Sequence, residues 1–246
     1  MKILFVGLGS IGSRHLQNMR SLLEKQGTEA AFYALRGTNR PLRTEVAPLI
    51  RQSYLNAEEV PDDFDIVFIT NPTSEHSRML RKLKDKTKHL FIEKPVVLDA
   101  HDDILEALRS FEGVAYVACP LRHTRVFKAL KHICAEQKDI YSVRAICSSN
   151  LSAWRPGQDY RYTYSAISAL GGGVERDLIH EWDYLTDLFG FPPVCRLSAV
   201  ITLISKWTAR MWRAILRSMR IKSWSCTLTT LAKNRGVKWS CIRRTM

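Results

Sequence analysis

The chain has 246 residues, of which 46% are hydrophobic and 25% charged, the composition of an ordinary globular protein with room for two domains. No apolar run reaches 18 residues, so the sequence predicts no membrane-spanning helix, and we expect a cytoplasmic protein. Six cysteines lack any C-x-x-C spacing, which argues against a zinc site or a disulfide framework; we expect buried thiols and no metal.

The formal net charge of +13 is unevenly distributed along the chain. Residues 1–200 carry 26 basic and 24 acidic side chains, whereas residues 201–246 carry eleven Lys or Arg and no Asp or Glu. The basic excess therefore belongs to the last 46 residues. Nucleic-acid binding through this tail is the least favoured hypothesis, and salt-dependent binding that vanishes when residues 201–246 are removed would reveal it.

The first twelve residues, MKILFVGLGSIG, predict a strand, a glycine turn and the start of a helix. Residues 3–6 are apolar, and Gly7, Gly9 and Gly12 follow in the G-x-G-x-x-G spacing. These glycines suit a tight turn, a close approach to a pyrophosphate, and close helix–strand packing, although a plain strand–turn–helix would also use them. The residues that we expect to contact a dinucleotide here are Gly7, Gly9, Ser10, Ile11 and Gly12.

A second strand over residues 30–35 ends at Arg36. An acidic residue near this point commonly binds the ribose 2′-hydroxyl of NAD, whereas an arginine suits the 2′-phosphate of NADP. Arg36 and Arg40 therefore favour NADP over NAD, the alternative being a solvated basic loop. Residues 39–63 fit a helix, a short strand and a loop.

Two further strands end in polar motifs. Residues 65–70 form a buried strand that Asn71 and Pro72 close, and Thr73 or Ser74 caps the next helix, with His76 as a helix-start residue or cofactor neighbour. Residues 89–92 form another strand, followed by Glu93-Lys94-Pro95. A lysine at the carboxyl end of a parallel strand faces the ligand crevice, where its ammonium group can donate to a substrate oxygen. After a helix capped by Asp99, residues 114–118 complete an α/β pattern.

The alternation ends near residue 120. A helix, a strand over residues 140–148 and a polar, aromatic loop over residues 154–166 lead to three glycines and a helix that ends at Phe189. On that helix Asp177, His180 and Glu181 share a face, which an amphipathic helix without catalytic function would also produce. The loop residues Arg155, Tyr160 and Tyr164 either contact substrate or pack on the sheet.

The set GLGSIG, NPTSEH, EKP and GGG-x-x-x-D-x-x-H-x-x-D resembles the Gfo/Idh/MocA family of NAD(P)-dependent sugar oxidoreductases. The resemblance implies a Rossmann domain, a C-terminal, largely antiparallel sheet, and a small-molecule sugar substrate. It implies that Lys94 polarises or protonates the substrate oxygen, that His180 is the acid/base and that Asp177 positions the sugar, although the family spacing is D-x-x-x-H. The remaining cofactor contacts that it implies are Asn71, Pro72, His76, Glu93 and Lys94.

We therefore expect a dinucleotide-binding Rossmann domain over residues 1–120, a partial substrate domain over residues 121–200 and a basic tail of uncertain structure over residues 201–246. The tail contains a single glycine and no acid, unlike a family sheet, so we expect an incomplete α+β C-terminal domain, low stability, weak or no turnover, and self-association. The sequence leaves three further possibilities open. The tail could form a helix over residues 207–219, the protein could be a homo-oligomer, and it could be a non-catalytic dinucleotide-binding protein instead of an enzyme.

Overall fold

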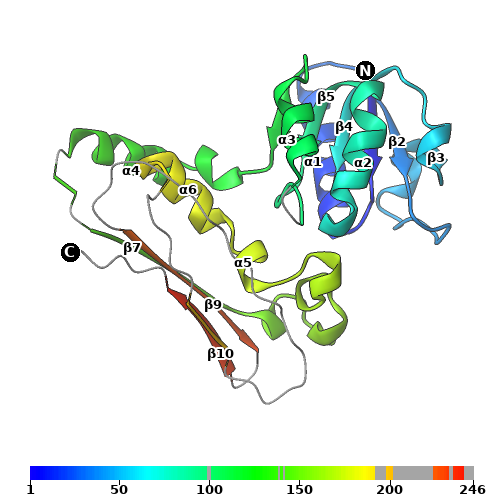
Figure 1. Ribbon diagram of the computed structural model, residues 1–246. Helices are drawn as coiled ribbons and strands as arrows, with labels where there is room; N and C mark the ends of the chain where they lie inside the picture. Colours follow the sequence, from blue (N-terminus) through cyan, green and yellow to red (C-terminus); the bar gives the residue numbers. More distant parts are fainter. Residues whose placement is uncertain are drawn as a thin grey trace. The chain divides into compact units, whose positions relative to one another are not determined.

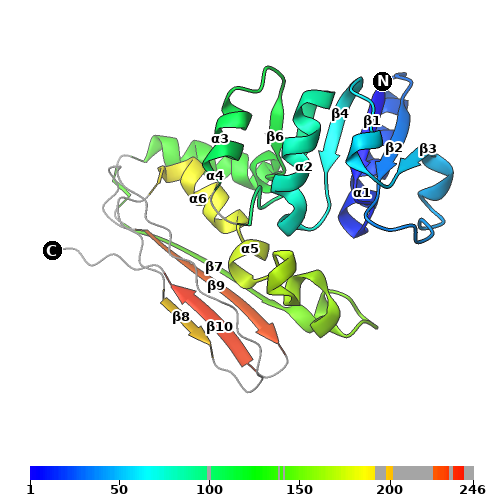
Figure 2. The same cartoon turned by 45° about the vertical axis from the view of Figure 1, so that its right-hand side comes forward.

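The computed structural model describes residues 1–98, 101–137, 139–140, 142–191, 198–201, 224–232 and 235–240. The chain divides into two compact units, Met1–Ala118 and Cys119–Met246 (Figures 1 and 2). The α/β class expected from the sequence is confirmed in the first of them.

Six parallel strands form the sheet of the N-terminal unit. They are β1 (Lys2–Val6), β2 (Ala31–Leu35), β3 (Ile50–Tyr54), β4 (Phe64–Ile69), β5 (Thr87–Ile92) and β6 (Ala115–Val117). Their order, β3-β2-β1-β4-β5-β6, is that of a Rossmann fold. The order reverses between β1 and β4, and open α/β sheets bind ligands at the carboxyl ends of the strands beside such a point.

Helices cover both faces of this sheet. They are α1 (Ser10–Lys25), α2 (His76–Leu83) and α3 (Asp102–Arg109). Side chains alternate along β1, so Ile3 and Phe5 pack with Leu16 of α1 in one cluster, whereas Leu4 and Val6 belong to the cluster that holds α2 and α3. Both faces of β1 are therefore buried, as the continuous apolar run ILFV predicts.

A row of aromatic rings crosses the α1 face of the sheet. Phe5 stacks on Phe68 with 4.5 Å between ring centroids, and Phe68 stacks on Phe91 at 4.7 Å. Tyr116 continues the row at 5.3 Å from Phe91. The imidazole of His15, on α1, lies 4.8 Å from the Phe91 ring, so the row brings a polar side chain of α1 next to β5.

Two helix boundaries differ from the sequence-based expectation. Neither Thr73 nor Ser74 caps α2: the chain leaves β4 through a 3-10 turn, η3 (Thr73–Glu75), and the α-helical N-cap is Glu75, without a side-chain capping bond. Because of this turn, the α-helix begins at His76, three residues after the expected cap. Thr73 itself is buried. Asp99 lies outside the described residues, and His101 occupies the N-cap of α3.

The segment between β2 and β4 contains no α-helix among its described residues. In place of the expected helix it forms two three-residue 3-10 turns, η1 (Ala47–Leu49) and η2 (Ala57–Glu59), on either side of β3. Pro41 and Pro48 explain the difference, because a proline inside a helix removes a hydrogen bond and clashes with the preceding turn.

The C-terminal unit contains a mixed sheet in the order β7-β9-β10-β8. Its strands are β7 (Val143–Asn150), β8 (Ser198–Ile201), β9 (Trp224–Ala232) and β10 (Arg235–Ser240). β7 pairs with β9 in parallel, and the other pairs are antiparallel. Parts of the region expected as a tail of uncertain structure thus form β9 and β10, whereas the helix expected over residues 207–219 lies outside the described residues.

The described residues of this unit form three α-helices, α4 (Arg125–Glu136), α5 (Val174–Asp177) and α6 (His180–Phe189), with 3-10 turns between Leu151 and Leu170. The single helix expected between the three glycines and Phe189 is therefore two helices, α5 and α6. The backbone turns at residues 178–179, where the Glu181 N–H donates to Leu178 O, three residues back. Leu178 and Leu185 bury their side chains against Ala145 of β7. α6 ends at Phe189, and the residue after it is Gly190 with φ +73°, as expected.

Candidate functional site

The glycine turn after β1 has the geometry that the motif predicts. Gly7 has φ +84°, and a Cβ there would lie 2.9 Å from Asn71 Cα. A Cβ on Gly12 would lie 2.2 Å from Gly7 O, whereas a Cβ on Gly9 would meet nothing within 4 Å. Gly7 and Gly12 are therefore required by the fold, and the space beside Gly9 is open to a ligand.

The first turn of α1 presents backbone donors to that open space. Gly9 is the N-cap, and the Ser13 N–H donates to Gly9 O at 3.0 Å. The preceding amides, of Ser10, Ile11 and Gly12, have no carbonyl within the helix to which they can donate. The first turn has no acidic residue. This helix end therefore favours an anion such as a pyrophosphate.

Asn71 lies on the other side of the turn, directly after β4. Thr70 fixes this point, because its hydroxyl lies 2.7 Å from Gly7 O and 3.0 Å from Val6 O. The Asn71 Oδ1 atom is buried and accepts no hydrogen bond from the described protein atoms. A buried acceptor without a donor is costly, so this amide fits a bound group that donates a hydrogen bond. The residues present thus fit a dinucleotide.

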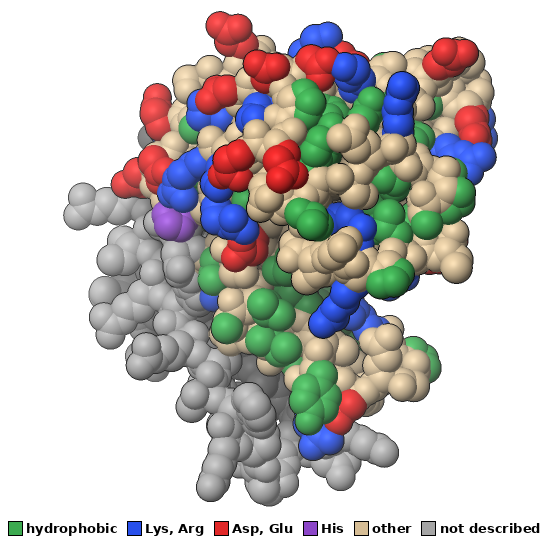
Figure 3. All heavy atoms as spheres, turned by 90° about the vertical axis from the view of Figure 1, so that its right-hand side faces the viewer, with side chains coloured by type: hydrophobic (Ala, Val, Ile, Leu, Met, Phe, Trp, Pro, Cys, Tyr) green, Lys and Arg blue, Asp and Glu red, His purple; other side chains and the backbone are tan. Residues whose placement is uncertain are grey.

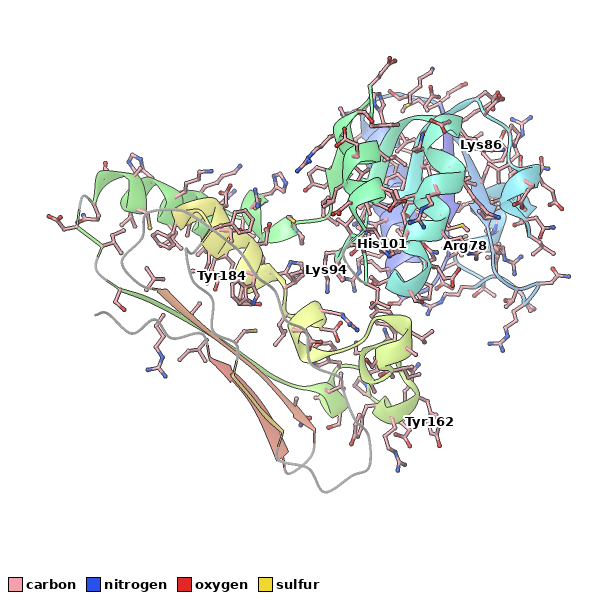
Figure 4. The ribbon with its side chains drawn as sticks, viewed as in Figure 1. Arg78, Lys86, Lys94, His101, Tyr162 and Tyr184 are labelled. Carbon is pink, nitrogen blue, oxygen red and sulfur yellow. The ribbon has the colours of Figure 1, made fainter. Side chains whose placement is uncertain are left out.

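Glu93 links β5 to α1. Its Oε1 lies 2.6 Å from His15 Nε2, and its Oε2 accepts the Lys94 N–H at 3.1 Å. The side chains of Glu93 and His15 are only 13% and 19% exposed. Glu93 therefore fixes the backbone of Lys94, the side chain of which is labelled in Figure 4. The His15 contact was not predicted, because the two residues lie 78 positions apart.

Arg36 follows β2 at the carboxyl edge of the sheet. Its backbone N–H donates to Tyr54 O at 2.9 Å, which holds the residue beside the end of β3. The position is half-buried. A cation, rather than the acidic residue typical of NAD sites, thus occupies the strand end where the adenosine ribose is bound in Rossmann folds.

His76, expected as a helix-start residue or cofactor neighbour, begins α2 and is 1% exposed. Its two ring nitrogens lie close to backbone carbonyl oxygens of Asn71, Pro95 and Val96. Burial lowers the pKa of His76, and the three carbonyl oxygens act in the opposite direction. Pro72 precedes η3, and Lys94 and Pro95 are joined by a cis peptide bond.

The aromatic loop of the C-terminal unit holds Tyr160 and Tyr164 in 3-10 turns and Arg155 in a bend between two such turns. Tyr164 donates its hydroxyl proton to Gly171 O at 3.1 Å, which ties the loop to the three glycines. Tyr160 begins the turn η7 (Tyr160–Tyr162), and Arg155 is exposed. Tyr164 therefore has a structural contact that the sequence did not predict.

Asp177 and His180 lie on different helices of this unit, at the end of α5 and the start of α6. Asp183, one turn after His180, receives hydrogen bonds from Arg122 at 2.6 to 3.1 Å, and Arg122 also bonds to Asp187 at 3.0 Å. The Asp183 side chain is 14% exposed. This cluster fastens α6 to the segment before α4. Its partners are about 60 residues apart, so the sequence holds no signal for it.

Cys119, Cys134 and Cys147 are half-buried rather than fully buried, and none of the three is in a disulfide. Burial and the neighbouring Glu181 carboxylate raise the pKa of Cys147 to about 11, so this thiol stays protonated and unreactive at neutral pH. Within the described part of the chain, no three His, Cys, Asp or Glu side chains are grouped as metal ligands would be.

A hollow of about 950 Å³ lies at the opposite, amino-terminal edge of the Rossmann sheet. Its walls include Lys2, Asp63, Asp65 and Lys88. Lys2 pairs with Asp63, and Lys88 pairs with Asp65 at 2.7 Å, so both of these lysines are already paired with carboxylates. The hydrogen bond from Lys88 lowers the pKa of Asp65. The carboxyl edge, with its free amides, is therefore the better anion site.

The strand order, the glycine turn and the open helix end define a Rossmann unit of the dinucleotide-binding class. Residues 1–118 match the model of the oxidoreductase family with an NAD-binding Rossmann fold, Gfo/Idh/MocA. The resemblance noted in the sequence is thereby confirmed, as is a nicotinamide dinucleotide as the cofactor.

Individual relatives support the same fold. Myo-inositol 2-dehydrogenase of Thermotoga maritima is 24% identical over 197 residues, which are 77% of this chain and 55% of that protein. The crystal structure of myo-inositol 2-dehydrogenase from Lactobacillus plantarum superposes with a TM-score of 0.68 at 23% identity, covering 84% of this chain and 61% of that one. The WlbA (WbpB) dehydrogenase of Thermus thermophilus, in complex with NAD and UDP-GlcNAcA, gives 0.65 at 19% identity, covering 80% and 66%.

The chain spans about half the length of the curated relatives that it matches. In the described part of the chain no helix is both long and apolar enough to cross a membrane.

Proposed function

We propose that the protein is an oxidoreductase that transfers a hydride between a nicotinamide dinucleotide and a sugar or sugar derivative. One observation carries the proposal: three features that suit a dinucleotide and its substrate lie at the carboxyl ends of neighbouring strands. They are the open space beside Gly9 after β1, the unpaired Asn71 amide oxygen after β4, and the Lys94 backbone held by Glu93 after β5. The names of the relatives, two inositol dehydrogenases and a dehydrogenase bound to a nucleotide sugar derivative, support this substrate class.

The residues of this chain would divide the work as follows. The dinucleotide, when bound, supplies or accepts the hydride. The amides at the start of α1 and the Asn71 side chain bind and orient it. The Lys94 ammonium group donates a hydrogen bond to the reacting substrate oxygen, and His180 takes the hydroxyl proton in oxidation or returns it in reduction. Asp177, Arg155, Tyr160 and Tyr164 orient the sugar.

The experiment is cofactor titration followed by turnover on a panel of inositols, sugars and sugar acids. Lys94→Ala and His180→Ala should each lower turnover by at least about a hundredfold and spare cofactor affinity, as expected for proton-transfer groups. Wild-type rates in either variant remove that residue from the mechanism. Tight dinucleotide binding without turnover on any substrate would instead support a non-catalytic dinucleotide-binding protein.

Arg36 carries a proposal about cofactor choice. A cation at this strand end favours the 2′-phosphate, so we propose that NADP binds more tightly than NAD. Arg36→Asp should reverse the order of the two dissociation constants. Equal affinities in the wild type and the variant would refute the preference and leave dinucleotide binding intact.

Location and partners complete the proposal. We place the protein in the cytoplasm and allow a homo-oligomer. Acidic and basic side chains are interspersed among the coloured residues on the face of the molecule in Figure 3. A sugar or sugar derivative is the partner that we propose.

A further inference from the structure

His15 and Glu93 form a partly buried polar pair between α1 and the end of β5. The Glu93 Oε1 atom lies 2.6 Å from His15 Nε2, and Glu93 Oε2 accepts the Lys94 backbone N–H at 3.1 Å. The side chains of His15 and Glu93 are 19% and 13% exposed. The two oxygens of one carboxyl group therefore face two donors, one on the helix that begins at the glycine turn and one on the backbone of Lys94.

One N–H on the His15 ring is enough for this contact. A neutral imidazole with its proton on Nε2 donates to Glu93 Oε1, and a charged imidazole does the same, so the bond forms in both protonation states. Because the pair is largely shielded from solvent, water does not fully replace a lost donor. Without the His15 donor, the Glu93 carboxyl group keeps only one of its two restraints and can turn away from the Lys94 N–H.

The packing around the pair does not depend on this bond. The Glu93 backbone is already held by its own N–H, which donates to Ile69 O at 3.0 Å. Helix α1 is held by Leu16, which is fully buried in the cluster on β1. The His15 ring lies 4.8 Å from the Phe91 ring, a contact that a phenyl ring at this position would keep. The fold therefore has other means of holding α1 and Glu93 in place, and the bond is available for a finer task.

We propose that His15 is a positioning residue, which acts through Glu93 to fix the backbone at Lys94. The part that concerns Lys94 in catalysis rests on the oxidoreductase function proposed above. A carboxyl group held between two donors restrains the backbone that carries Lys94, and its ammonium group has to reach one substrate oxygen in one orientation. His15 lies in the second turn of α1, so it ties the placement of Lys94 to the helix whose first turn faces the dinucleotide.

Three substitutions at His15 separate the donor from the volume of the ring. His15→Phe keeps an aromatic ring against Phe91 and removes the donor. The amide nitrogen of Gln occupies nearly the place of Nε2, so His15→Gln keeps the bond to Glu93. The amide nitrogen of Asn occupies nearly the place of Nδ1, so His15→Asn carries the same group and does not reach Glu93. His132→Phe is the matched control, because His132 belongs to an exposed His–Glu pair on α4.

Three measurements on the full chain follow the effect. Hydrogen exchange of the Lys94 amide, by NMR, reports its bond to Glu93. The acylation rate of the Lys94 side chain by an amine-reactive ester, normalised to exposed Lys128, reports the ammonium group. Fluorescence titration with NADH reports the first turn of α1.

We expect the donor, and not the ring, to decide the result. In His15→Phe and His15→Asn the Lys94 amide should exchange at least about fivefold faster, the scale of one lost hydrogen bond, and the acylation rate should change at least about twofold. NADH affinity should stay within about twofold, because the amides at the start of α1 keep their places. His15→Gln and His132→Phe should match the wild type in all three measurements.

A residue that only holds α1 on the sheet gives a different pattern. His15→Phe would then weaken NADH binding and leave the two Lys94 rates unchanged, and this result overturns the proposal. A folded His15→Gln that fails to restore the Lys94 rates overturns it as well. Where His15→Phe does not fold, Gln and Asn variants with indistinguishable Lys94 rates overturn it equally. None of these measurements requires turnover, so a protein that shows the expected pattern but oxidises no sugar would refute the oxidoreductase function and leave the positioning role standing.

Discussion

The glycine turn allows a sharp test, because two glycines three positions apart have opposite requirements. Gly12→Ala places a methyl group 2.2 Å from Gly7 O and 2.7 Å from Thr70 Oγ1, well inside van der Waals contact. The first neighbour is backbone and the second is held by hydrogen bonds, so neither can rotate away. The N-terminal end of α1 must therefore move away from β1.

The cost follows from overpacking, which typically destabilises a protein by about 1–3 kcal/mol. A backbone clash belongs at the upper end, so we expect the free energy of unfolding to fall by about 3 kcal/mol, a large part of the ~5–15 kcal/mol of a typical domain. For a domain of this size that loss lowers the Tm by about 10 °C. NADH affinity should fall as well, because the helix amides shift with the helix.

Gly9→Ser is the matched variant. Nothing lies within 4 Å of its Cβ, and serine is a good N-cap, so the Tm should stay at the wild-type value. The new side chain enters the space assigned to the pyrophosphate and accepts hydrogen bonds from the amides meant for it, so NADH affinity should fall at least about tenfold. Calorimetry and fluorescence titration measure the two effects. An unchanged Tm in Gly12→Ala, or unchanged affinity in Gly9→Ser, would refute the reasoning.

Three further outcomes are expected. Burial lowers the pKa of His76 below the 6.5 of the unfolded chain, so the unfolded state binds more protons at acidic pH. The free energy of unfolding should therefore decrease as the pH falls below about 6.5. Urea titrations between pH 5 and 7.5 should show that the free energy of unfolding depends less on pH in His76→Gln than in the wild type. Asp183→Asn removes charge-assisted bonds from Arg122 and should destabilise the C-terminal unit by about 1–2 kcal/mol, whereas Arg161→Ala, in an exposed pair, should leave the thermal melt unchanged. Limited proteolysis should cleave first after residue 200, where the acidic residues end; a region 201–246 as protected as residues 1–118 would contradict the low stability inferred from its composition.

The sequence predicted the Rossmann half well because its signals are local. An apolar run before a glycine turn is contiguous, and so is a strand followed by Asn71-Pro72 or by Glu93-Lys94. It failed where backbone geometry depends on neighbours: the 3-10 turn before α2 and the turn at residues 178–179 change hydrogen-bond partners without changing the apolar spacing. The periodicity of side chains continues across such a turn, so it does not reveal the break.

The candidate site was predicted by residue type but not by contact. Glu93 and His76 stand in motifs that the sequence singled out, yet their partners, His15 and the carbonyl oxygens after Lys94, are distant in the chain. Arg122 had no motif at all. Side-chain partners at long sequence separation are set by tertiary packing, and one sequence contains no record of them.

These contacts change how the motif should be understood. In the three motifs of the N-terminal unit, GLGSIG, NPTSEH and EKP, Gly7 and Gly12 act by lacking a side chain. Glu93 and His76 contact neighbouring backbone or side-chain atoms. Of these motif residues, Asn71 alone presents a buried atom with no partner among the described residues. Most of the motif therefore builds a backbone surface instead of contacting a ligand. Such a surface accepts any dinucleotide of the right shape, so discrimination between cofactors must come from positions outside the motif, and Arg36 is the residue that the fold places at the ribose end of the crevice.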